Sequence, residues 1–169
     1  GLQAAYYDVR EGIGFNKTPD VYGAFPTDPY SHTPGFAGAR QPGMTGQVKE
    51  EVLTRLLELG VEVADARVSF KPSVLRRSEF LGSSATLRYF DTAGASQAVA
   101  LEAGELGFTY CQVPVVMALA DSPSITLHTA DGATESVTGS VLTAEQSEAL
   151  FKKTGHYVRL DVRVTQVMD

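Results

Sequence analysis

The sequence predicts a mainly β fold, an antiparallel β-sandwich preceded by a loop-rich helical N-terminal segment. Three observations lead to this prediction. From Val61 onward, short stretches alternate between apolar and polar residues, which is the pattern of half-buried strands. Aspartate and glycine turn signals at 91–94 and 130–132 separate some of these stretches. Ahead of them, the one strongly marked helical pattern lies in the first sixty residues. We therefore place a helical and loop segment at 1–60 and a β-sandwich at 61–169.

The strands of the second region are expected in the stretches ARVSFKP, ATLRYFD, SQAVALE, SITLHTA and HYVRLDVRVTQV. In the last stretch we expect one wet face, with Tyr157, Arg159, Asp161 and Arg163, and one buried face, with Val158, Leu160, Val162 and Val164. The more uniformly apolar run at 105–120 predicts a strand buried on both faces, in which Pro114 forces a bulge or a break into two strands. A short helix is expected at 143–154, because Thr143 and Gln146 have the spacing of a capping box.

The first region is expected to contain a weakly helical start within 1–15, a long ordered loop at 16–45 and a helix at 46–59 that stops at Gly60. Apolar residues cover about half of the circumference of the helix at 46–59, more than the stripe of an ordinary surface helix. Its charged residues fall on the opposite side: Glu50, Glu51, Arg55 and Glu58. The β-sandwich covers only one apolar flank, so the other flank needs the long loop, a second subunit or a missing helical domain.

Composition excludes several classes of function. A net charge of −6 and a pI near 5.0 argue against a nucleic-acid binder, which needs a clustered basic surface. With Cys111 as its one cysteine, the sequence holds neither an internal disulfide nor a cysteine zinc site. Because its three histidines lack ligand spacing, no metal and no cofactor are expected. No stretch approaches the ~20 apolar residues that span a bilayer, so we expect a soluble protein. The compartment stays open, and export with a removed signal peptide is compatible with the sequence.

The order of these elements resembles the end of the helical toroid in six-hairpin carbohydrate-active enzymes, where a last long helix leaves an (α/α) barrel and enters a C-terminal β-sandwich. The resemblance rests on QPGMTGQVKEEVLTRLLELGV, followed by ARVSFKPSVLRRSEFL, and on YGAFPTDPYSHTP, which looks like the loop bordering the sugar cleft. It implies that the chain is the C-terminal part of a larger glycoside hydrolase or phosphorylase. A saccharide would then be bound by the complete enzyme.

Within the loop, Asp28 and His32 are the candidate catalytic pair. They lie four residues apart and are flanked by Pro29 and Pro34, whose restricted φ angles would hold them rigidly. A carboxylate and an imidazole held together could bind sugar hydroxyls, orient a water or act as base and partner. The structural alternative is that Asp28 caps a turn and His32 hydrogen-bonds loop backbone.

Further candidates for contact with a saccharide surround this pair: Tyr22, Tyr30, Gln41, Gln47, Lys49 and Glu50. The tyrosines suit stacking on sugar rings or anchoring the loop, and the amides match hydroxyl groups. Glycoside hydrolysis normally needs two carboxylates, whereas this chain offers a candidate for at most one of them. We therefore expect a module that contributes a cleft loop and a structural β-sandwich but is not catalytically complete alone. The alternative is a non-catalytic interaction or dimerisation module.

Overall fold

The computed structural model describes residues 1–12 and 47–168. The chain divides into two compact units, Gly1–Arg55 and Leu56–Asp169. In the first unit, α1 spans Leu2–Gly12 and confirms the helical start predicted within 1–15. Helix α3 spans Gln47–Glu58, across the boundary between the units, and confirms the helix predicted at 46–59.

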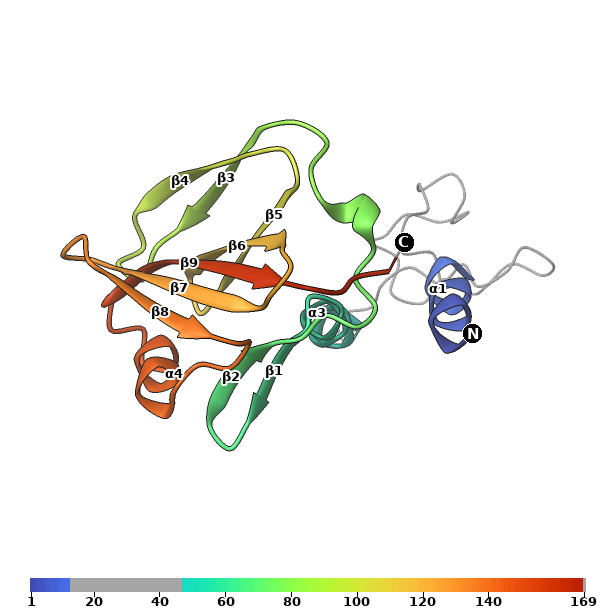
Figure 1. Cartoon of the computed structure of the whole chain (residues 1–169), viewed down its shortest axis with the longest axis horizontal. Helices are drawn as coiled ribbons and strands as arrows, with labels where there is room; N and C mark the ends of the chain where they lie inside the picture. Colours follow the sequence, from blue (N-terminus) through green and yellow to red (C-terminus); the bar gives the residue numbers. More distant parts are fainter. Residues whose placement is uncertain (13–46, 169) are drawn as a thin grey trace. The chain divides into compact units, whose positions relative to one another are not determined.

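The second unit is built mainly from strands, so the predicted mainly β fold is confirmed (Figure 1). Its strands are β1 (Val61–Ala64), β2 (Arg67–Phe70), β3 (Ala85–Phe90), β4 (Ser96–Leu101), β5 (Glu105–Tyr110), β6 (Val113–Leu119), β7 (Ser124–Thr129), β8 (Thr134–Thr138) and β9 (Tyr157–Val164). A 3-10 helix, η1 (Arg77–Glu79), and helix α4 (Ala144–Phe151) complete the unit.

The strands form one five-stranded sheet in the order β5-β6-β9-β7-β8 and two separate hairpins, β1–β2 and β3–β4. The layers thus consist of one full sheet and two hairpins rather than two full sheets. One pairing departs from the antiparallel prediction, since β6 and β9 run parallel. Parallel neighbours need a long connection, and β7, β8 and α4 together provide it. Figure 1 shows β3–β4 on one side of the sheet and α4 with β1–β2 on the other.

The main core lies on the side of the sheet that faces α4 and β1–β2. Its fully buried members include Val68, Phe70, Val115, Met117, Ile125, Leu127, Leu142, Leu150, Leu160 and Val162. The opposite face is covered at β5 by the other hairpin. There Gly107 lies so close to Leu101 of β4 that a Cβ atom added to the glycine would stand 2.6 Å from Leu101 Cδ1. Successive residues of β6 are buried from Val113 to Met117, so this strand is buried on both faces, as its apolar sequence predicts.

The apolar run at 105–120 breaks into two strands, β5 and β6, as one of the two predicted outcomes has it, but Pro114 is not the cause of the break. The break is a turn at Cys111 and Gln112, whose φ angles are 50° and 65°. Pro114 itself lies within β6, opposite Thr109 of β5. Pairing of β6 with β9 begins only at Val115, so the proline needs no N–H for that partner.

The predicted alternation along the last strand holds from Leu160 onward but is wrong at its start. Tyr157 is buried and Val158 is 43% exposed, the reverse of the prediction. The cause is a β-bulge: His128 pairs with Arg159 and Thr129 pairs with Tyr157, so Val158 is an extra residue on β9. An extra residue shifts every side chain before it to the other face.

Helix α4 begins as predicted. Thr143 Oγ1 accepts from the backbone N–H of Gln146, and Gln146 Oε1 accepts from the backbone N–H of Thr143, which completes the capping box. Ser147 fastens the helix to β2, because its buried Oγ accepts from the Val68 N–H at 3.0 Å. The helix ends at Phe151, earlier than predicted, and Lys153 takes a φ of 49° where the chain leaves it.

Helix α3 has two apolar flanks with different surroundings. Leu56 and Leu59 pack against the core of the second unit. Leu53 and Leu57, one turn apart on another flank, are 62% and 61% exposed. Glu58 was expected on the polar side but is only 2% exposed, because the chain turns back at Gly60 and lies against the segment after β2.

Candidate functional site

The structure does not test the site that the sequence predicts. Five of the predicted residues lie outside the described part of the chain: Tyr22, Asp28, Tyr30, His32 and Gln41. Three lie in the first turn of α3, with side chains outside the described part: Gln47, Lys49 and Glu50. Their assignment to a saccharide site therefore stays a prediction.

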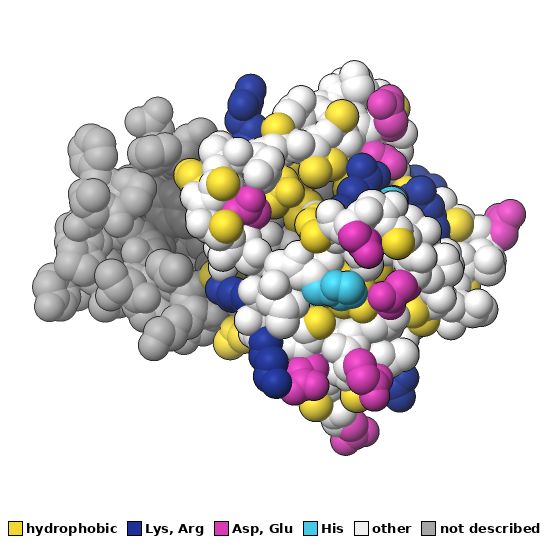
Figure 2. All heavy atoms as spheres, turned by 90° about the vertical axis from the view of Figure 1, so that its left-hand side faces the viewer, with side chains coloured by type: hydrophobic (Ala, Val, Ile, Leu, Met, Phe, Trp, Pro, Cys, Tyr) yellow, Lys and Arg dark blue, Asp and Glu magenta, His cyan; other side chains and the backbone are white. Residues whose placement is uncertain are grey.

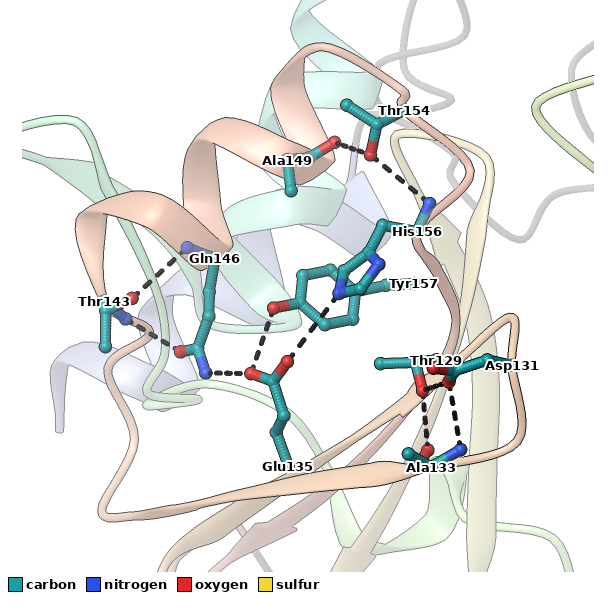
Figure 3. Close-up of polar contacts among 10 residues, drawn as sticks. All are labelled: Thr129, Asp131, Ala133, Glu135, Thr143, Gln146, Ala149, Thr154, His156 and Tyr157. Atoms are coloured by element: carbon teal, nitrogen blue, oxygen red, sulfur yellow. Dashed lines mark hydrogen bonds and ion pairs between the residues drawn. The ribbon is translucent and has the colours of Figure 1, made fainter.

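Within the second unit, a polar cluster gathers around Glu135 of β8 (Figure 3). Its Oε2 accepts hydrogen bonds from Gln146 Nε2 at 2.9 Å and from the Tyr157 hydroxyl at 3.0 Å. His156 Nε2 lies 3.7 Å from Glu135 Oε1, and the rings of His156 and Tyr157 meet edge to face. Since Gln146 also belongs to the capping box of α4, this one carboxylate joins β8, the start of α4 and the start of β9.

The contacts shift the acidity of two members of this cluster. The hydrogen bond from Gln146, with further ones from Tyr157 and His156, holds the pKa of the Glu135 carboxyl below its ordinary value of 4.5. Burial, the hydrogen bond to Glu135 and the charge of that carboxylate raise the pKa of Tyr157 to about 12. At neutral pH the tyrosine is therefore a protonated donor and the glutamate an ionised acceptor, which is a fixed clamp rather than an acid–base pair.

This clamp predicts an acid-sensitive contribution to stability. A carboxyl group whose pKa is lowered on folding stabilises the native state above its unfolded pKa and loses that contribution as the pH falls through the folded pKa. We expect Glu135→Gln to be less stable than the wild type at pH 7, with the difference shrinking below pH 4.5. Urea unfolding midpoints over the acid range measure it. Glu62→Gln, at an exposed position on β1, is the control, and a gap that persists or widens in acid contradicts the prediction.

A second polar group lies on the face of the sheet that was predicted to be wet. His128 Nε2 is 2.8 Å from Asp161 Oδ2, and Arg159 Nε donates to Asp161 Oδ1 at 2.6 Å. These side chains are a fifth to a third exposed. The carboxylate is thus held between an arginine and a histidine on neighbouring strands, an arrangement that stabilises strand pairing.

Within the described residues, the histidines and the cysteine are not arranged for metal binding or nucleophilic chemistry. His128 and His156 face different carboxylates, Asp161 and Glu135. Among the described residues, no group of three or more histidine, cysteine or acidic side chains is placed to hold a metal ion. Partial burial raises the pKa of the Cys111 thiol, so it lacks the lowered pKa of a reactive cysteine.

A pocket of about 430 Å³ opens where three connections meet. These are the β3–β4 turn, the β5–β6 turn and the connection from α4 to β9. The residues that line it include two tyrosines, Tyr89 and the buried Tyr157, and three polar residues, Asp91, Gln97 and Gln112. The volume falls in the range of small-ligand sites.

No protein-family model matches this chain, and no curated protein matches it significantly. In the described ranges, no helix has both the length and the apolar character needed to cross a bilayer. Figure 2 shows acidic and basic side chains interspersed on one face, without a patch of one sign.

The pocket residues escaped prediction from the sequence. Asp91 is recognisable as a turn residue, and this prediction is confirmed because Gly94 N–H donates to the Asp91 carbonyl at 2.9 Å. Gln97 and Gln112 belong to different hairpins, so only the tertiary structure brings them to one place. The sequence shows only that polar residues occur at the ends of predicted hairpins, and this observation does not identify a pocket.

Proposed function

We propose that this chain is the C-terminal module of a carbohydrate-active enzyme. In this proposal the loop at 16–45 forms one wall of a saccharide site, with Asp28 and His32 as its reactive pair, and the β unit supports it. The module is not catalytically complete, and the rest of the enzyme supplies the other wall and at least one further carboxylate.

One observation of the structure supports this proposal above others. Leu53 and Leu57 form an apolar row on α3 that is more than half exposed, while Leu56 of the same helix and Leu59, just after its end, pack on the β unit. Fully burying a leucine side chain is worth roughly 1.5–3 kcal/mol. A helix that is apolar on two flanks is typical of a position between two packed bodies. A neighbouring helix of a toroid would cover the free row.

Two carboxylates of the β unit, Glu135 and Asp161, support the same assignment of saccharide chemistry to the loop and the rest of the enzyme. Glu135 accepts hydrogen bonds from two side chains, and Asp161 lies between an arginine and a histidine. Both are occupied in joining secondary-structure elements. Chemistry on a saccharide is therefore better assigned to the loop and to the remainder of the enzyme than to these groups.

A specific experiment tests the role of the leucine row. We expect the double substitution Leu53→Lys and Leu57→Lys to lower the thermal stability and activity of the full-length enzyme, because it places two charges in a buried interface. In the 169-residue chain alone the same change should shift the unfolding midpoint little, since both positions are exposed. Lysine is a good helix former, so helix propensity is preserved.

Val63→Lys is the matched control, because Val63 is a similarly exposed apolar residue on β1. A full-length double variant that behaves like the wild type contradicts the proposal. The same leucine row would also suit the alternative function, a dimerisation module. Light scattering separates the two, since the alternative requires a dimer of the 169-residue chain that the double substitution dissociates.

A further inference from the structure

The pocket between the three connections of the second unit is built from side chains that hold one another in place. Asp91 Oδ1 accepts from the backbone N–H groups of Ala93 and Ala95, each at 2.9 Å. Its Oδ2 accepts from Gln97 Nε2 at 2.9 Å. The carboxylate and the amide are therefore fixed on the rim of the β3–β4 turn.

The same network reaches the other two connections. Gln112 Nε2 donates to the backbone carbonyl of Asp91 at 3.0 Å, and Gln112 Oε1 accepts from Lys153 Nζ at 2.7 Å. The β3–β4 turn, the β5–β6 turn and the end of α4 are thereby tied into one rim. Groups held in place before a ligand arrives lose less entropy on binding.

The groups in the pocket still have unused hydrogen-bonding capacity. A carboxylate has about four acceptor positions, and Asp91 uses three of them on the groups above. The Gln97 amide retains its carbonyl oxygen and one N–H. Tyr89 contributes a phenol and a ring, whereas Tyr157 is buried and its hydroxyl is bound to Glu135. Hydrogen-bond donors and acceptors thus lie beside the aromatic ring of Tyr89.

We propose that this pocket binds one neutral sugar residue, with its hydroxyl groups on Asp91 and Gln97 and its C–H face against the ring of Tyr89. An anion is disfavoured, because Asp91 stands in the pocket and the nearby Lys153 amine is bound to Gln112. A metal ion is disfavoured, because the lining supplies one carboxylate. The lowered pKa of Asp91, caused first by the Gln97 hydrogen bond, keeps it an acceptor at neutral pH.

The preference for a neutral, hydroxyl-rich ligand follows from the pocket alone, whereas its identification as a saccharide rests on the proposed function. The pocket is separate in sequence from the loop that carries Asp28 and His32. It would therefore act as an ancillary saccharide site on the β unit, independent of the reactive pair.

Amide NMR spectra of the full 169-residue chain, titrated with glucose and with cellobiose, test this inference. We expect at least one sugar to shift the amide signals of Ala93, Gln97 and Gly155 with millimolar affinity, and acetate to leave them unchanged. Gln97→Leu should weaken binding by about five- to tenfold, the effect of losing one or two hydrogen bonds. Tyr89→Ala should weaken it similarly by removing an aromatic wall.

Gln166→Leu is the matched control, since it makes the same change at an exposed residue outside the pocket lining. Spectra that stay native-like outside the pocket establish that each variant folds. The inference is overturned if neither sugar shifts these signals, if acetate shifts them more strongly, or if Gln97→Leu binds as the wild type does. Asp28→Ala should retain the pocket shifts, so a failure here is distinguishable from a failure of the proposed loop site.

Discussion

Gly60→Ala is expected to destabilise the second unit by at least about 3 kcal/mol, through backbone strain combined with steric overlap. Gly60 has a φ of +71°, which disfavours any residue with a Cβ atom. A Cβ atom at this position would lie 2.1 Å from Pro72 N and 2.3 Å from Lys71 C. Both atoms belong to the backbone, so no side-chain rotation relieves the overlap.

The overlap would also break a backbone hydrogen bond that connects two segments of the fold. The Lys71 N–H donates to the Gly60 carbonyl at 2.7 Å, which joins the end of α3 to the segment after β2. Denaturant unfolding of the 169-residue chain measures the loss. Gly94→Ala is the control, because Gly94 has a φ of +78° but nothing within 4 Å of an added Cβ atom. It should show the conformational cost alone, about 1–2 kcal/mol. Equal losses in the two variants would contradict the account of Gly60.

Gly60 also shows how far the sequence predicts this fold. Its place after an amphipathic pattern predicts the end of a helix, and the structure confirms it, since the Gly60 N–H donates to the Leu57 carbonyl at 2.9 Å. The capping box of Thr143 and Gln146 was predictable for the same reason. Such features depend on residues three or four apart. The close approach of Pro72 to Gly60 depends on tertiary packing, which local patterns do not contain.

The mispredictions have the same origin in long-range structure. Alternation along β9 places Tyr157 in solvent, but a bulge opposite His128 and Thr129 puts it in the core. Alternation alone does not reveal a bulge, because the extra residue is defined by the partner strand. Likewise, the parallel pairing of β6 with β9 is set by the path of the chain through β7, β8 and α4.

The two candidate sites differ in how far the sequence alone predicts them. The loop pair Asp28 and His32 was identified from local composition, and it lies outside the described residues. The pocket on the β unit was found only from the structure, because its polar rim joins residues from 91 to 153. Sequence patterns can identify candidate functional residues within one segment. A pocket between hairpins can be identified only when the pairing register of every strand is known.

Asp28→Ala and His32→Ala are each expected to lower kcat/KM of the full-length enzyme by about a hundredfold or more, if the pair acts in proton transfer. General acid–base catalysis contributes roughly 10²–10⁴-fold, so its loss appears mainly in kcat. A pair that only binds sugar hydroxyls would instead raise KM with little change in kcat. Initial-rate kinetics with the natural saccharide separate these outcomes. Ser31→Ala, between the two residues in the sequence, is the control and should be near wild type.

The most direct test of the central claim is an equilibrium saccharide titration of the full-length enzyme, carried out on the wild type, Asp28→Ala and His32→Ala together with their turnover. If the loop forms a wall of the saccharide site, both substitutions weaken binding or reduce turnover while Ser31→Ala does neither. Wild-type affinity and wild-type turnover in both variants would contradict the claim.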